Sequence, residues 1–193
     1  MQFENVKTDP FAYQRKSHMK LGEIFFWTAT INNWQRLLTE DKYKEVIISS
    51  LEYLSNENLI DVFAFVIMPN HIHLIWRINK MNGKESPQGS FLKYTAHLFK
   101  KMLKEGDPGQ LNKYKSDAVN KSFEFWQRDP LAIHLYSKEV AVQKLKYIHN
   151  NGHSHLLNYP KDTFLSRKVL ALLFLFQQVC LQKKIFYAYQ IMY

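Results

Sequence analysis

LIDVFAFVIMPNHIHLIWRI, residues 59–78, joins two apolar runs through a Pro-Asn turn. The first run, 59–68, is almost unbroken and has the length of a strand, which is typical of a central strand covered on both faces. Successive side chains of a strand point to opposite faces, so His71 and His73 share one face of the second run, 71–78. The stretch therefore predicts two adjacent antiparallel strands, with a histidine pair on the second.

Elements on both sides of this stretch alternate between strand and helix patterns. Aromatic and β-branched residues predict strands at 23–31 and 123–127, the latter continued by 131–136 after an Asp-Pro break. Helical spacing predicts helices at 41–56, at 90–104 with Ser90 as cap, and at 138–151 with Ser137 as cap, while 105–122 reads as a loop. The order β-α-β-β-α-β-α predicts a ferredoxin-like α+β sandwich, with an antiparallel sheet and helices on one face.

Composition limits the class of protein. The chain has 193 residues, 46% of them hydrophobic, and a formal charge of +9, which favours a polyanionic partner such as nucleic acid or an anionic membrane surface. Its one cysteine, Cys180, excludes an intramolecular disulfide and a cysteine metal cluster, which suits the cytoplasm. The N-terminus lacks an apolar signal region, and the longest apolar run, 169–176, is too short to span a membrane.

The end of the chain differs in composition from the rest. No Asp or Glu occurs after Thr163. We therefore expect one domain over 1–160 and an atypical tail, with one or two helices, over 161–193. A second His-x-His pair, His153 and His155, has Ser154 as its spacer and no following apolar run, so a loop is the expected structure there.

The helix at 138–151 offers polar side chains that can complement the histidine pair. Its apolar stripe contains Ala141, Leu145 and Ile148, whereas Tyr147 and Asn151 lie one turn apart on a polar side. Two imidazoles hold a divalent cation well only when a third ligand joins them. A tyrosine nucleophile beside a third ligand is one interpretation; a surface tyrosine and an incidental pair of histidines is the other.

MPNHIHLI at 68–75 resembles the His-hydrophobic-His motif of the HUH single-stranded DNA endonucleases. FWQRDP at 125–130, followed by YIHNN at 147–151, is similar to the tyrosine region of the IS200-like transposases, particularly the REP-associated tyrosine transposases. SFLKYTAHLFKKML at 90–103 belongs to the same resemblance, which spans about residues 13–151. Gly152 stands where relatives usually have proline.

The resemblance implies a function and a role for each matching residue. His71, His73 and Asn151 are expected to bind Mg²⁺ or Mn²⁺, with Tyr147 as the nucleophile on a helix near the histidine strand. The expected enzyme is a transposase that nicks and joins single-stranded DNA through a 5′-phosphotyrosine intermediate. Its expected substrate is a strand that forms a hairpin. We expect a monomer or homodimer in the cytoplasm, associated with the nucleoid and not with a membrane.

A non-catalytic module of the same fold that binds single-stranded nucleic acid is the alternative function. Candidate DNA contacts combine cations with groups that can stack on bases or hydrogen-bond to them. They are Lys93, Lys100, Lys101, Lys104, Trp126, Gln127, Arg128 and Lys144. Cleavage of an oligonucleotide that depends on a divalent metal separates the two functions.

Overall fold

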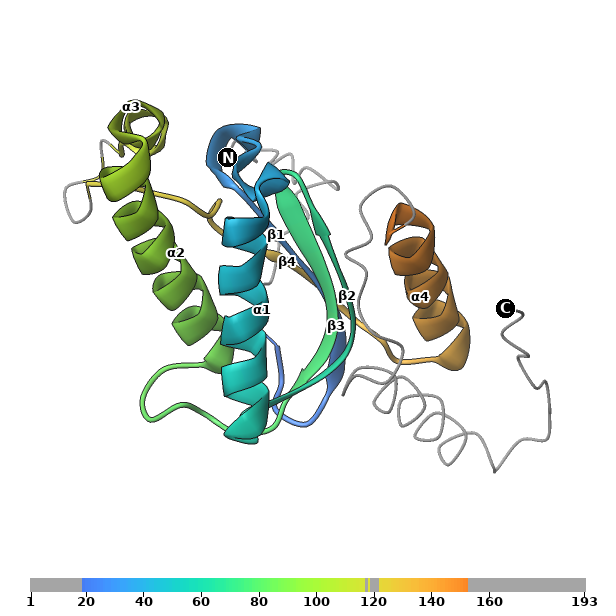
Figure 1. Ribbon diagram of the computed structural model, residues 1–193. Coiled ribbons are helices and arrows are strands. Elements are labelled where there is room, and N and C mark those ends of the chain that lie inside the picture. The colour runs from blue at the N-terminus through green and yellow to red at the C-terminus, as the bar shows by residue number, and fades with distance from the viewer. Residues whose placement is uncertain (1–18, 117, 119–121, 153–193) are drawn as a thin grey trace, which may run out of the picture.

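The protein folds around a four-stranded antiparallel sheet with the strand order β2-β3-β1-β4 (Figure 1). The computed structural model describes residues 19–116, 118 and 122–152. The strands are β1 (Ile24–Thr30), β2 (Ile60–Met68), β3 (His71–Ile78) and β4 (Leu131–His134). The α+β class and the predicted strand pair 59–78 are confirmed.

Helices cover both faces of this sheet, which corrects the expectation of helices on one face. Helices α1 (Asp41–Asn56) and α2 (Pro87–Gly106) lie side by side on one face, and α4 (Lys138–Gly152) lies on the opposite face (Figure 1). The short helix α3 (Pro108–Leu111) follows α2. The sheet therefore separates the helix that carries Tyr147 from the other two long helices.

Each face of the sheet has its own hydrophobic core, because alternate residues of each strand point to opposite sides. The larger core joins the sheet to α1 and α2 and contains fully buried Trp27, Trp76 and Phe91. The smaller core lies under α4 and contains Phe26, Phe63, Val66, Ile75, Leu135, Ala141 and Ile148. Burial of Ala141 and Ile148 confirms the predicted apolar stripe and fixes which side of α4 faces the sheet.

Between residues 86 and 127 the structure differs from the prediction. Helix α2 begins at Pro87, and its cap is Ser86, whose hydroxyl accepts a hydrogen bond from the Gly89 N–H at 3.1 Å; proline suits this first helical position. The expected loop at 105–122 contains α3 and a 3₁₀ turn, Asn112–Tyr114.

The predicted strand at 123–127 is replaced by isolated bridges, Ile31↔Trp126 and Lys115↔Phe123. The aromatic side chains of this segment pack in the larger core against α2, so the pattern that suggested a strand reflects burial.

Helix α4 begins as predicted, with the hydroxyl of Ser137 accepting from the Val140 N–H at 3.4 Å. None of the helices in the described part of the chain is long and apolar enough to cross a membrane. His153, His155 and the expected domain boundary after residue 160 lie outside the described residues.

Candidate active site

His71 and His73 lie at the start of β3, on the face of the sheet that α4 covers. In the pairing of β1 with β3, Thr30 is opposite His71 and Thr28 is opposite His73. His73 is 6% exposed, and the Nε2 atoms of the two imidazoles are 3.1 Å apart. The two histidines share one face of the strand, as predicted from the spacing, and their rings also direct a nitrogen to the same point.

Neighbouring side chains hold the other nitrogen of each ring. The amide Oδ1 of Asn70 lies 2.7 Å from His71 Nδ1, and the hydroxyl of Thr28 lies 2.8 Å from His73 Nδ1. With Asn70 Oδ1 as the acceptor, His71 carries its proton on Nδ1, so His73 donates from Nε2 to His71 and accepts from Thr28.

Both Nε2 lone pairs become available to one cation when the His73 proton moves to Nδ1, where the Thr28 hydroxyl can accept a hydrogen bond. Thr28 and Asn70 are therefore positioned as the partners that orient a pair of metal ligands.

Burial keeps the two imidazoles neutral. It lowers the pKa of His71 below its usual value of 6.5. For His73, burial is the largest cause, and the nearby His71 and Lys144 add to it, so that its pKa falls to about 4. Neutral imidazole is the form that binds metal ions.

Tyr147 stands beside this pair on α4. Its ring centroid is 5.1 Å from that of His73 and 6.0 Å from that of Phe26, with an edge-on arrangement in both cases. Phe26 also stacks on His73, at 5.1 Å between centroids. Tyr147 is nevertheless 46% exposed, so the ring edge packs on the sheet while part of the side chain meets solvent.

Lys144 adds a positive charge to the same place. Its ammonium lies 4.9 Å from the centroid of the Phe26 ring and 6.0 Å from that of the Tyr147 ring, one helical turn before Tyr147. The structure thus groups two imidazoles, a phenol and an ammonium between β1, β3 and α4.

Asn151 lies one turn after Tyr147, at the end of α4. Its Nδ2 donates a hydrogen bond to the Tyr147 carbonyl at 2.9 Å, which holds the amide along the helix. Within the described residues, no third His, Cys, Asp or Glu joins the histidines in a metal-binding group. Asn151 as a third ligand stays a prediction.

The predicted DNA contacts fall on different surfaces. Helix α2, which carries Lys93, Lys100, Lys101 and Lys104, is on the face opposite the histidines (Figure 1). Lys100 lies over the Phe123 ring, at 4.9 Å. Of the predicted cations, Lys144 is the one that contacts the Tyr147 ring.

The remaining predicted DNA contacts are Trp126, Gln127 and Arg128. Trp126 is 6% exposed, packs against Phe99 and donates its Nε1–H to the Thr95 hydroxyl at 2.9 Å. A buried ring cannot stack on a base, so the prediction for Trp126 is corrected: it is a core residue. Gln127 is half-buried, and Arg128 is exposed and pairs with Glu124 at 3.3 Å.

Three residues of the site were missed: Phe26, Thr28 and Asn70. Phe26 and Thr28 alternate along β1 and so share a face, a signal that is readable from IFFWTAT at 24–30. To know that this face also carries the histidines, one needs the register between β1 and β3. The sequence contains no turn that fixes this register.

No family model and no curated protein matches the sequence. Solved structures that are similar to this chain include two transposases. One is a REP-associated tyrosine transposase bound to a REP hairpin, with 16% identity, a TM-score of 0.48 and coverage of 72% of this chain and 71% of that chain. The other, a "putative transposase" from Deinococcus radiodurans R1, has 16% identity, a TM-score of 0.36 and coverage of 68% and 97%. At 16% identity, a similar chain trace does not transfer a function.

Proposed function

We propose that the protein is a metal-dependent enzyme that nicks and joins single-stranded DNA, with Tyr147 as the nucleophile. One observation carries the proposal. The Nε2 atoms of His71 and His73 converge at 3.1 Å, and the Tyr147 ring lies 5.1 Å from the His73 ring. A convergent pair of neutral imidazoles beside a partly exposed phenol is the donor set and nucleophile that such a reaction requires.

The residues present fit a divalent cation. His71 and His73 would supply two nitrogens, and the amide oxygen of Asn151 would supply a third ligand. Such a mixed set suits Mn²⁺ well, whereas Mg²⁺ prefers oxygen ligands and retained waters. When bound, the cation would neutralise charge that develops on the phosphate and on the leaving oxygen.

The reaction we propose is a transesterification. The Tyr147 oxygen forms a bond to phosphorus, the bond between phosphorus and the 3′ oxygen breaks, and the phenolic proton is balanced by the proton that the 3′ oxygen takes up. The products are a 5′-phosphotyrosine and a free 3′ hydroxyl. Attack by another 3′ hydroxyl reverses these steps and joins strands, so no nucleotide cofactor is consumed.

The residues around Tyr147 position it for this attack. Phe26 and His73 pack against the ring and restrict its rotation, while Lys144 places an ammonium beside it that can bind the phosphate. The charge of +9 supports a polyanionic substrate. A hairpin in the substrate is supported by the resemblance of the motifs.

A nucleic-acid-binding module without catalysis is the second candidate. The side-chain amide of Asn151 bonds to the helix backbone, and the described residues provide no acidic third ligand. Both observations favour this candidate, in which the histidine pair and Tyr147 form part of a binding surface.

Formation of a covalent adduct tests the proposal. A single-stranded oligonucleotide library that includes hairpins, incubated with the full chain and Mn²⁺, should give a protein–DNA adduct that survives denaturation. Tyr147→Phe should abolish it, because only the oxygen is removed. Tyr136→Phe is the matched control, since Tyr136 is 75% exposed and lies before α4. An adduct that persists in Tyr147→Phe would contradict the assignment of the nucleophile.

A further inference from the structure

Trp34 is exposed in a chain whose other tryptophans are buried. The sequence has four tryptophans. Trp27 and Trp76 are 0% exposed and Trp126 is 6% exposed, whereas Trp34 is 61% exposed. Burial of an indole removes a large apolar surface from water, and the exposed Trp34 lacks this stabilisation. Packing therefore does not explain a tryptophan at this position.

The backbone around Trp34 holds the ring outward. Asn33 and Trp34 are consecutive residues in the left-handed region, with φ of 53° and 56°. Residues with a Cβ rarely adopt this conformation, and a bulky residue does so at a conformational cost. Hydrogen bonds from Trp34 N to the Ile31 carbonyl at 3.0 Å and from Asn32 N to the Phe125 carbonyl at 2.8 Å maintain the loop.

The same loop is fastened to the turn that precedes His71. The Ile31 N–H donates to the Asn70 carbonyl at 2.8 Å, and the Leu38 N–H donates to the Pro69 carbonyl at 2.9 Å. Asn70 is the residue whose side chain contacts His71. Trp34 therefore lies on a loop that backbone hydrogen bonds join to the turn at the histidine end of the sheet.

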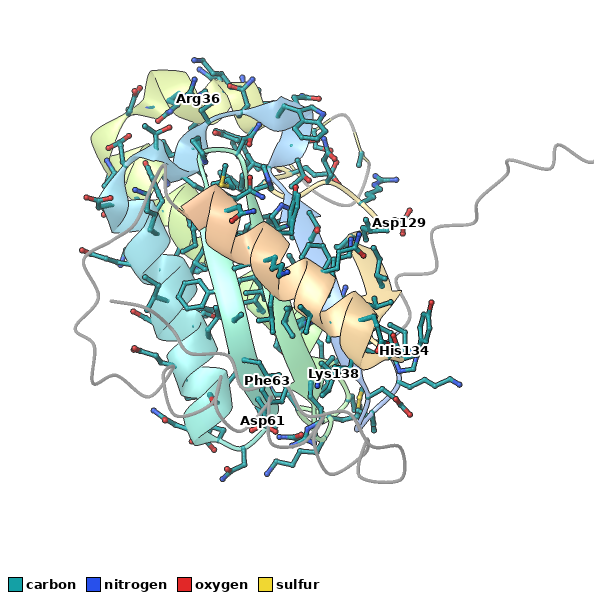
Figure 2. All side chains as sticks on the ribbon, turned by 90° about the vertical axis from the view of Figure 1, so that its right-hand side faces the viewer. Arg36, Asp61, Phe63, Asp129, His134 and Lys138 are labelled. Atoms are coloured by element: carbon teal, nitrogen blue, oxygen red, sulfur yellow. The ribbon has the colours of Figure 1, made fainter. Side chains whose placement is uncertain are left out.

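Arg36 gives this loop a positive charge. Arg36 is exposed two residues after Trp34, while Leu37 and Leu38 are buried and anchor the chain behind it. Figure 2 shows Arg36 at the end of the molecule where α4 finishes, whereas Asp61 and Phe63 lie at the opposite end. An exposed indole two residues before an exposed arginine offers the combination of stacking and charge that binds single-stranded nucleic acid.

We propose that Trp34 is a stacking platform for one base of the single-stranded DNA that flanks the cleavage point, with Arg36 on the adjoining phosphate. This inference rests on the proposed function, because it names how the substrate of that same site is held. Stacking tolerates any base, so Trp34 sets the register of the strand relative to His71 and not its sequence.

Fluorescence can report on this contact directly, because Trp34 is the tryptophan that a neutral quencher reaches. Acrylamide quenching is measured on the full-length Tyr147→Phe protein in EDTA, so that neither metal nor chemistry intervenes. A hairpin oligonucleotide with a single-stranded extension should protect Trp34 from acrylamide. An abasic site scanned along the extension should abolish protection at one position and leave it unchanged at the others.

Affinity provides the second measurement. Trp34→Ala should weaken binding of the oligonucleotide about 10-fold, and Trp34→Phe, which keeps an aromatic ring, should weaken it less. Tyr53→Ala is the matched control, because Tyr53 is equally exposed, at 61%, but lies on α1 across the sheet from α4.

The outcomes separate the two proposals. Three results would overturn the stacking platform. They are acrylamide quenching that does not change when the oligonucleotide binds, an affinity of Trp34→Ala equal to that of the unsubstituted protein, and no binding of any oligonucleotide. Adduct formation by Trp34→Ala with wild-type affinity would overturn it while leaving the proposed catalysis intact. Position-specific protection without any adduct from the wild-type protein would support the platform and favour the binding module over the enzyme.

Discussion

The Thr28 hydroxyl on β1 lies 2.8 Å from Nδ1 of His73 on β3, so a pair of residues 45 positions apart in sequence is joined at the base of the candidate site. Thr28 would touch no substrate or metal in this arrangement. Its contribution is to fix the orientation of the ring and the nitrogen that carries the proton, as partners of metal-bound histidines do. A threonine that only stabilised the fold would not affect the affinity of the site for a metal ion.

Thr28→Val should weaken Mn²⁺ binding about 10- to 100-fold while both histidines are retained. Valine has nearly the same shape but cannot bond to Nδ1, so His73 loses its orientation. Isothermal titration measures the affinity, and circular dichroism confirms the fold. Thr30→Val, the same change two residues along β1, is the matched control. Equal Mn²⁺ affinity in Thr28→Val and Thr30→Val would contradict the role given to Thr28.

His73→Ala should remove most of the Mn²⁺ affinity, because a single remaining imidazole and an amide hold such an ion poorly. Mn²⁺ should also bind the wild-type protein more tightly than Mg²⁺, since the proposed ligands include two nitrogens. His134→Ala is the control: His134 bonds to Glu23 at 2.8 Å and lies near the start of α4, away from Arg36 (Figure 2). Loss of Mn²⁺ binding in both variants to the same extent would remove His73 from the site.

The sequence was sufficient to predict a helix or strand and its bounds where the local hydrophobic pattern agrees with the burial in the structure. Residues 71–78 were predicted as a strand and 41–56 as a helix, and β3 and α1 have these bounds, because alternation and helical spacing there coincide with the two cores. The proximity of Tyr147 to His73 was also expected, from the resemblance of the motifs, whereas the helical pattern alone placed Tyr147 on a polar side of the helix.

The remaining errors and omissions depend on contacts between distant segments. Phe123 and Phe125 looked like strand residues, yet their burial against α2 does not require a ladder of hydrogen bonds. Thr28 was missed because only the register of β1 against β3 brings it to His73. The exposure of Trp34 was not predicted, and its loop is held by hydrogen bonds to the distant residues Asn70 and Phe125.

Tyr114 should make the protein less stable in alkali. Burial, and then the charge of Tyr43, raise the pKa of Tyr114 to about 12, and its ring stacks on Phe125. In the unfolded chain a tyrosine ionises near pH 10. Its stabilising contribution is therefore complete below pH 10 and is lost as the pH rises towards 12. In urea titrations, Tyr114→Phe should lose less unfolding free energy over this interval than wild type. Tyr53→Phe, at an exposed position, should behave as wild type.

Lys144 and the α2 lysines predict different salt dependences, because the sheet separates them (Figure 1). If the strand lies against Tyr147, Lys144 neutralises one of its phosphates, and Lys144→Ala should reduce the log–log salt slope of oligonucleotide binding by about 0.7. Lys101→Ala, an exposed lysine on the opposite face, is the matched control and should leave this slope unchanged. Fluorescence anisotropy from about 50 to 200 mM salt covers the informative range. A slope that falls in Lys101→Ala but not in Lys144→Ala would place the DNA on α2 and separate binding from the histidine site.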